Sequence, residues 1–497
     1  MTTQTQFDQL KTAGYNLIPV YRQRLADTET PLSVFARLKE HKQAYLFESV
    51  EGGENWARYS IIGLGESTVF SCNAGELTIQ QADGTIEKQP CTDPFQFIRD
   101  FQSQYKVPTQ ADLPALPSFT GGLVGYFGYD AVRYIEPRLN NAPEADPVGL
   151  PDIWMMLSKT VIVFDNLKDT LFLIVHADVV DADAYSQAQQ QLDALEDLLA
   201  TPISLKATPH TAPHFESLTG KAKFLESIAT VKEYIRAGDV MQVVPGHRMV
   251  SDFDGEPLQV YRALRHLNPS PYLFLVQGQT LENNQPFHIV GSSPEILSRL
   301  ENGIATVRPL AGTRPRGKTK EEDLALEQDL LSDEKEIAEH LMLIDLGRND
   351  VGRVSKIGKV QVTDQMVIER YSHVMHIVSN VQGEVRDDVD ALDVFKATFP
   401  AGTLSGAPKI RAMEIIDQVE PVKRGIFGGA VGYLGWHGEM DMSIAIRTCV
   451  IRENKVYVQA GAGLVYDSNP ESEWNETQIK ARAVIKAVEL SSNGLIL

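Results

Sequence analysis

The 497-residue chain has few cysteines and no long apolar runs, and each shortage excludes a class of protein. Cys72, Cys91 and Cys449 are too widely spaced to form a metal-binding or disulfide framework. No run approaches the roughly 18 to 20 apolar residues of a membrane span, and the run LFLIV at 171–175 has only the length of a strand. Residues 1–16 lack the basic and apolar regions of a secretory signal. We therefore expect a protein of the reducing cytoplasm that does not enter a membrane.

Positive charge is also scarce, because 46 lysines and arginines face 66 aspartates and glutamates and leave a net charge of -20. An acidic protein repels nucleic acid and anionic membranes, so neither is expected as a partner. A small anionic ligand would instead be held by a local device, such as a metal ion, an arginine or the N-terminus of a helix.

The composition that remains, 43% hydrophobic and 23% charged residues, is typical of a soluble globular protein. A chain of this length predicts two large subdomains or one elaborate double-layered domain. The best boundary is the proline-containing, weakly apolar stretch at 201–220. We accordingly divide the chain into an N-terminal domain over 1–202, a linker over 203–221, a second domain over 222–490 and a tail over 491–497.

Helices and strands alternate irregularly on both sides of this boundary. Leu192, Leu195 and Leu199 follow the helical spacing and predict a helix near the end of the first domain. A second helix is predicted over 224–235, ending at Gly238, and the stretch MQVVPGHRMV after it is typical of a strand. The pattern predicts an α+β fold with large, mainly antiparallel sheets and peripheral helices.

The segment VRPLAGTRPRG at 307–317 combines three arginines with two glycines. They are Arg308, Arg314, Arg316, Gly312 and Gly317. Such a segment suits a loop that brings backbone N–H groups and positive charge to an anion, although a solvated turn has the same composition. Neither interpretation explains why the central residue is a bare alanine, Ala311.

An acidic helix is predicted at 332–350, where Glu336, Glu339 and His340 share one face. Residues 341–344 are apolar around the whole circumference, so the helix is expected to be buried. Buried carboxylates need a cation, which would be a metal ion or a basic side chain.

A second acidic helix is predicted at 471–490, directly after Pro470. Glu473, Glu476 and Lys480 stack on it at helical spacing, although acidic residues in a first turn also simply favour the helix dipole. Two carboxylates from two helices, completed by water and a substrate carboxylate, would suit octahedral Mg²⁺.

Glycine clusters at 399–409, 425–435 and 459–468 lack the spacing of nucleotide-binding loops. They predict tight turns or a close approach of the backbone to a ligand. His376 is a lone histidine in an apolar run, which by itself is typical of a core residue.

Taken together and in order, these motifs resemble the chorismate-utilising enzymes, most of all the members that form anthranilate. The resemblance covers nearly the whole chain and is densest from 222 to 490, the expected catalytic domain. The motifs are GDVMQVVP, NPSPYLF, GSSPEIL, RPLAGTRPRG, DEKEIAEHLMLIDLGRND, YSHVMH, GTLSGAPK, IRTCV, QAGAG and ESEWNET. It implies a sandwich-like core of large antiparallel sheets, chorismate as substrate and Mg²⁺ as cofactor.

The resemblance also implies roles for individual residues. Glu295 would protonate the departing C4 hydroxyl, His376 would act in the later loss of pyruvate, and Thr403 would lie in an active-site loop. The substrate-binding residues would be Gly312, Thr313, Phe427, Arg447, Gly461, Ala462, Gly463 and Lys480. Glu339 and Glu476 would hold Mg²⁺, with Glu336 and Glu473 in support. Phe427 stands where the family often has tyrosine, so a hydroxyl contact to substrate is missing.

Two positions distinguish the products that family members make. Isochorismate-forming relatives have a lysine where this chain has Gln242, and glutamine cannot activate water as a base. Relatives that make 4-amino-4-deoxychorismate use a lysine as nucleophile at C2 where this chain has Ala311. The alanine therefore leaves C2 free for ammonia. Two alternatives remain, an enzyme forming 4-amino-4-deoxychorismate and a non-catalytic tryptophan-binding regulatory protein.

The stretch at 44–63 resembles the tryptophan-regulatory element of the family. Its effector pocket would be lined by Ser49, Pro271, Tyr272 and Leu273, so feedback inhibition by L-tryptophan is expected. The three cysteines lack the setting of an amidotransferase nucleophile, which implies that ammonia comes from a glutamine amidotransferase partner. The expected assembly is a hetero-oligomer such as a heterotetramer.

Overall fold

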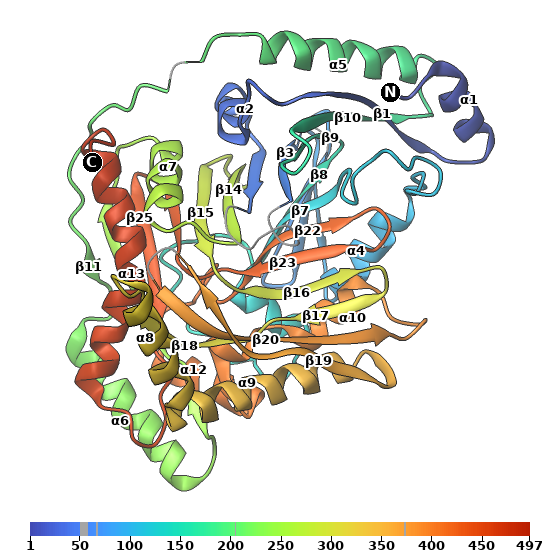
Figure 1. The fold of residues 1–497 in the computed structure, drawn as a ribbon. Helices are drawn as coiled ribbons and strands as arrows, with labels where there is room; N and C mark the ends of the chain where they lie inside the picture. Colours follow the sequence, from blue (N-terminus) through green and yellow to red (C-terminus); the bar gives the residue numbers. More distant parts are fainter. Residues whose placement is uncertain (50–57, 66–67, 204, 372–373) are drawn as a thin grey trace.

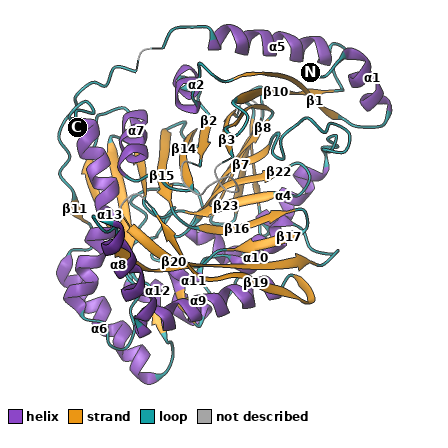
Figure 2. Cartoon of the chain, viewed as in Figure 1, coloured by secondary structure: helices purple, strands orange, loops and turns teal. Residues whose placement is uncertain are grey.

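The structure is a computed structural model that describes residues 1–49, 58–65, 68–203, 205–371 and 374–497. In this part of the chain the strands form two large sheets, of 11 and 12 strands, and one two-stranded ladder. Neighbouring strands of the large sheets run antiparallel (Figures 1 and 2). The predicted α+β class with mainly antiparallel sheets is confirmed.

In spatial order, the 11-stranded sheet contains β1 (Leu17–Leu25), β10 (Thr170–Asp178), β9 (Thr160–Asp165), β3 (Tyr59–Leu64), β2 (Ala44–Glu48), β14 (Tyr272–Gln279), β15 (Pro286–Ser293), β24 (Thr448–Arg452), β25 (Lys455–Gly461), β13 (Gly246–Asp252) and β11 (Glu216–Ser217). The 12-stranded sheet contains β18 (Leu310–Pro315), β20 (Val374–Val385), β17 (Ile304–Val307), β16 (Ile296–Glu301), β23 (Met440–Ile444), β22 (Ala430–Gly435), β7 (Gly122–Phe127), β8 (Ile153–Ser158), β4 (Val69–Asn73), β5 (Glu76–Gln80), β6 (Ile86–Pro90) and, paired with β20, β19 (Ser355–Arg370). The ladder joins β12 (Gln242–Val243) to β21 (Gly406–Ala407).

The two large sheets pack face to face, which confirms the sandwich-like core. Trp154 of the 12-stranded sheet meets Phe287 of the 11-stranded sheet edge to face, with ring centroids 5.2 Å apart. Strand β10 shows how the sequence produces this arrangement. Phe172 and Ile174 point into the core between the sheets, while the alternating residues such as Leu173 point to the opposite face.

Helices cover the two outer faces of the sandwich (Figure 1). The 11-stranded sheet is covered by α2 (Pro31–Leu38), α5 (Ala184–Leu199), α7 (Pro257–Leu267) and α13 (Pro470–Ser492), and α1 (Gln4–Thr12) lies beside β1. The 12-stranded sheet is covered by α4 (Pro94–Ser103), α9 (Glu334–Gly352), α10 (Ala391–Thr398) and the 3-10 helix η1 (Tyr129–Tyr134). The remaining helices are α6 (Lys221–Ala237), α8 (Lys320–Ser332), α11 (Gly402–Ser405) and α12 (Lys409–Val419).

The predicted helices at 192–199 and 224–235 are confirmed as α5 and α6, and Gly238 ends α6 with a positive φ of 83°. The predicted strand that follows is interrupted, because Pro245 has no N–H to donate to a ladder. Strands from 1–202 and from 222–490 lie in both large sheets, so the core runs across the predicted division, which stays a prediction. Among the described residues, no helix combines the length and apolar character needed to cross a membrane.

Candidate active site

Glu295 lies between β15 and β16, with only 7% of its surface exposed. The Thr403 hydroxyl of α11 donates a hydrogen bond of 3.1 Å to Oε1 of Glu295. Burial raises the pKa of Glu295 to about 8, against the opposing effects of Thr403, Lys480 and Arg447. The carboxyl is therefore largely protonated at neutral pH and can act as a general acid.

His376 lies on β20, 2% exposed, opposite Thr313 of β18. Its Nδ1 is 3.0 Å from the carbonyl oxygen of Gly312, which can only accept, so Nδ1 carries the proton and Nε2 carries the lone pair. The Thr313 hydroxyl is also 3.0 Å from Nδ1. Burial, followed by the charge of Arg447, lowers the pKa of His376 to about 4. The ring is thus a neutral base at physiological pH.

Arg447, directly before β24, acts electrostatically on both the acid and the base. Its positive charge lowers the pKa of Glu295 and the pKa of His376. Its own pKa is lowered by burial, against the neighbouring Tyr371 and Glu295. A half-buried guanidinium whose charge is disfavoured by desolvation suits the carboxylate of a ligand.

A glycine-containing turn follows β25 on the other side of this group. The Lys480 ammonium of α13 donates to the carbonyl oxygen of Gly461 at 3.2 Å. A Cβ atom at Gly463 would lie 2.7 Å from Nε2 of Gln242 and 3.7 Å from Oε1 of Glu339, so a larger residue would collide with the side chains here. The N–H of Ala462 donates to the carbonyl oxygen of Pro245 at 3.1 Å, so this amide is satisfied within the protein.

Two acidic helix ends border the same turn. The side-chain amide of Gln242 donates a hydrogen bond of 3.1 Å to Glu339 of α9. On α13, Lys480 forms an ion pair with Glu476 at 2.7 Å. Burial, and then the neighbouring Glu339, raises the pKa of Glu336. Burial likewise raises the pKa of Glu473, and the charge of Glu476 adds to it. Carboxylates that repel one another in this way favour a cation between them.

The donor chemistry of these helix ends fits Mg²⁺, which prefers carboxylate oxygens and keeps several waters. Within the described ranges, no group of three or more histidine, cysteine or acidic side chains is close enough to hold a metal by itself. Glu339 and Glu476 would thus supply part of a shell that water and substrate complete. The expectation that α9 is buried all round is wrong, because Leu341 is 44% exposed and only one side of the helix faces the sheet.

Phe427 lies in the turn that follows α12, 9% exposed. Its ring is close to Gly246, where an added Cβ would come within 3.1 Å of it, and Gly246 pairs with Gly461 across β13 and β25. The phenyl ring therefore supports the strand that ends in the glycine turn, and it has no hydroxyl with which to contact a ligand.

A separate cavity of about 320 Å³ opens between the two large sheets. The predicted effector residues all line it: Ser49, Pro271, Tyr272 and Leu273. Residues 50–57 of the predicted regulatory stretch lie outside the described residues. The volume is within the range of small-molecule sites.

Polar groups that sequence reasoning missed also line this cavity. Asp441 accepts hydrogen bonds of 3.0 Å from both the Tyr272 hydroxyl and Arg299. Burial raises the pKa of Glu439 to about 7. Strand β23 connects the cavity to the acid, because Ser443 lines the cavity and the N–H of Ile444 donates to the carbonyl oxygen of Glu295 at 3.0 Å.

Comparison with known proteins identifies the family to which the chain belongs. The family model described as chorismate binding enzyme matches residues 42–486. The chain belongs to this family. It is 88% identical over 497 residues to anthranilate synthase component 1 of Acinetobacter calcoaceticus, with 100% of both chains covered. It is 53% identical to anthranilate synthase component 1 of Pseudomonas aeruginosa, with 99% of both covered.

Solved structures of chorismate-binding enzymes agree with the fold. Anthranilate synthase component I from Streptococcus pneumoniae TIGR4 matches with a TM-score of 0.74 and 37% identity, over 88% of this chain and 95% of that chain. The menaquinone-specific isochorismate synthase from Escherichia coli matches with a TM-score of 0.68 over 97% of this chain and 98% of that chain. At 19% identity, this second likeness shows the fold alone.

One expectation for this member of the chorismate-binding enzyme family is wrong. The arginine-rich segment is mostly strand β18, not a loop that presents positive charge to an anion. Its arginines pair with carboxylates of the protein: Arg308 with Glu369, Arg314 with Asp329 at 2.6 Å, and Arg316 with Asp323 at 2.8 Å. The guanidinium groups are thus neutralised within the fold, and Arg447 is the cation beside the acid and the base.

Proposed function

We propose that the chain is the chorismate-binding component of an anthranilate synthase. It would aminate chorismate at C2 with loss of the C4 hydroxyl, and then eliminate pyruvate to give anthranilate. The observation that carries this proposal is the presence of a buried acid, Glu295, bonded by Thr403, together with a buried neutral base, His376, whose tautomer the Gly312 carbonyl fixes. The charge of one arginine, Arg447, acts on both groups. The high identity to anthranilate synthase component 1 supports the same activity.

The first stage needs a proton donor at the C4 oxygen. Glu295 supplies its proton as the C4–O bond breaks, so the hydroxyl leaves as water while ammonia forms a bond to C2. The hydroxyl of Thr403 donates to the carboxylate that results and stabilises it. Arg447 holds a substrate carboxylate, which orients the ring between Glu295 and His376.

The second stage needs a base. Nε2 of His376 takes the proton from C2, and the C3–O bond breaks as the ring becomes aromatic. The side chain leaves as enolpyruvate, which takes up a proton to give pyruvate. Nδ1 of His376 stays bonded to the Gly312 carbonyl, which fixes the tautomer. Mg²⁺ held by Glu339 and Glu476 would neutralise the ring carboxylate of the substrate.

Ammonia and regulation are proposed to come from outside this chain. A glutamine amidotransferase partner would supply ammonia, in a hetero-oligomer such as a heterotetramer. L-tryptophan would bind in the 320 Å³ cavity and act on Glu295 through β23. The cytoplasmic location stays a prediction.

The proposal is tested by incubating the purified chain with chorismate, an ammonium salt and Mg²⁺. We expect a fluorescent product that chromatography and mass spectrometry identify as anthranilate, and that is not formed without Mg²⁺. A 4-amino product would instead favour the aminodeoxychorismate alternative, and no turnover would favour a non-catalytic protein.

Ala311 offers a test of product choice. It is 9% exposed on β18 and pairs with Ile377, the residue that follows His376 on β20. Ala311→Lys should lower anthranilate formation at least about tenfold, equivalent to roughly 1.4 kcal/mol in the barrier, because an amine beside C2 competes with ammonia. Mass spectrometry should detect a covalent adduct. Ala311→Met adds similar bulk without an amine, and an equal loss in both variants with no adduct would reduce position 311 to a packing site.

The effector cavity gives a second prediction. Ser49→Ala should weaken inhibition by tryptophan at least about fivefold, the lower end of typical coupling between sites, with ammonia-dependent turnover retained. The physical reason is that Ser49 lines the cavity, whereas Glu295 and His376 are not among the residues that line it. Inhibition curves at fixed chorismate check it, and an unchanged curve would show that tryptophan binds elsewhere.

A further inference from the structure

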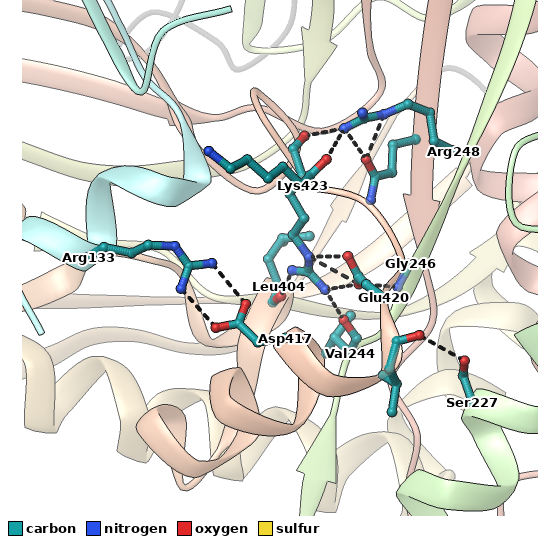
Figure 3. A network of polar contacts seen from close by, with 12 residues as sticks. Arg133, Ser227, Val244, Gly246, Arg248, Leu404, Asp417, Glu420 and Lys423 are labelled. Carbon is teal, nitrogen blue, oxygen red and sulfur yellow. Dashed lines mark hydrogen bonds and ion pairs between the residues drawn. The ribbon is translucent and has the colours of Figure 1, made fainter. Parts of the chain in front are cut away.

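A buried ion pair joins Arg424 to Glu420, the residue that directly follows α12. Figure 3 shows the polar contacts around Glu420. The two side chains are only 2% and 4% exposed, and their closest N–O distance is 2.6 Å. A buried pair of this kind is weak evidence for stability, because desolvation offsets the attraction. Its other contacts indicate a different role.

The guanidinium of Arg424 bonds two backbone segments at once. One amino group donates to the carbonyl oxygen of Leu404 at 2.6 Å, and the other donates to that of Val244 at 2.6 Å. These segments also meet directly, since the N–H of Val244 donates to Ser405. The planar fork of arginine is suited to such two-point contacts, which the ammonium of lysine cannot reproduce.

Each of the two segments carries a side chain of the site. Thr403, next to Leu404, donates to Glu295, and Gln242, two residues before Val244, donates to Glu339. Glu420 adds a second contact to the segment that contains Gln242 and Val244, because its carboxylate accepts the N–H of Gly246 at 2.7 Å.

A second buried arginine fixes the backbone of the pair itself. Arg248, 2% exposed, donates to the carbonyl oxygens of Lys423 and Arg424, at 2.8 and 2.6 Å (Figure 3). The ring of Phe427 lies 5.5 Å from the guanidinium carbon of Arg424. The pair is therefore held in one position by the loop that follows α12.

We propose that Arg424 and Glu420 are positioning residues, which set the place of Thr403 against Glu295 and of Gln242 against Glu339. This inference rests on the proposed function for its kinetic consequence. Its structural consequence, that the segments 242–246 and 402–407 move when the fork of Arg424 is lost, does not depend on the reaction.

The test replaces Arg424 with lysine, which keeps the charge but loses the fork. We expect Arg424→Lys to lower kcat at least about tenfold, because the acid is displaced from its position for proton transfer. The change in KM should be smaller, because the groups that bind the substrate are less affected. The alkaline limb of the pH profile should move to higher pH. The reason is that the Thr403 hydrogen bond lowers the pKa of Glu295, and this hydrogen bond is weakened in the variant. The charges of Lys480 and Arg447, which also lower this pKa, remain. Thr403→Val should move the limb in the same direction.

The matched control is Arg133→Lys. Arg133 of η1 forms a neighbouring ion pair with Asp417 of α12 at 2.8 Å (Figure 3). It also donates to the carbonyl oxygen of Leu139, which lies outside the segments 242–246 and 402–407. We expect kcat within about twofold of the original chain and an unmoved pH limb. Amide hydrogen exchange should rise over 242–246 and 402–407 in Arg424→Lys only.

The outcomes separate this inference from the proposed function. Turnover of the original chain tests the function. Hydrogen exchange, and the ratio of kcat in the variant to kcat in the original chain, test the positioning role. Unchanged exchange, or unchanged kcat in an active enzyme, would overturn it. If Arg424→Lys does not fold, Glu420→Gln carries the test, because it keeps the shape and an acceptor for Gly246. Failure of both variants to fold would assign the pair to stability and would equally overturn the proposal.

Discussion

Replacing Glu295 with glutamine is expected to lower kcat on the order of 10³-fold, the range of a lost general acid. Glutamine retains the shape and an acceptor for the Thr403 hydroxyl, but it has no acidic proton for the leaving group. In the original chain, kcat/KM corrected for free ammonia should fall as pH rises through about 8, where Glu295 loses its proton. In Glu295→Gln the residual rate should lack this limb. A variant with near-normal rate would remove Glu295 from the role of acid.

The same variant separates catalysis from folding. The pKa of Glu295 rises from 4.5 to about 8 on folding, so the folded chain binds the proton more tightly than the unfolded chain does. The original chain therefore loses stability from this group as pH rises from about 4.5 to about 8, and above that range the loss is complete. Glutamine carries no charge, so the variant should have the higher Tm at pH 8 and above. A lower Tm there would show that the carboxylate has a partner in the folded chain.

Replacing Glu339 with glutamine is expected to remove most of the Mg²⁺-dependent turnover while leaving the fold intact. Loss of one of the two carboxylates that would hold the metal should weaken Mg²⁺ affinity at least about tenfold and lower turnover on the order of 10²-fold. Titration calorimetry with Mg²⁺, or binding of Mn²⁺ followed by its spectrum, measures affinity without turnover.

The control for Glu339 lies on the same helix. Glu334 is exposed on the first turn of α9, so Glu334→Gln removes the same charge from the same element without touching the site. We expect affinity and rate close to those of the original chain. Equal effects of Glu334→Gln and Glu339→Gln would reduce the result to loss of general negative charge.

Periodicity predicted individual elements well because their faces are simple. Leu192, Leu195 and Leu199 all lie on the buried side of α5, and Gly238 ends α6 in the left-handed conformation that glycine adopts freely. The apolar turn at 341–344 misled, because Leu341 is exposed and Met342 only partly buried, although Leu343 and Ile344 are buried. A local pattern cannot show which sheet a helix will meet, so its outer side was assigned to the core.

The candidate site depended on contacts between residues far apart in the chain. Spacing within one segment indicated the acidic helices, but by itself it gave no reason to choose Glu295 or to treat His376 as more than a core residue. Their roles require Thr403, Gly312 and Arg447, which other elements supply. The charges of the arginine-rich segment showed the same limitation, since their partners on α8 and β19 are invisible in the local sequence.

The most direct test of the central claim follows isotopically labelled ammonium into the product of the purified chain with chorismate and Mg²⁺. The account predicts that the label is bound to the ring carbon next to the carboxylate, and that one pyruvate is released for each aromatic amine formed. Label at C4 in a product that retains its enolpyruvyl group, with no release of pyruvate, would contradict it.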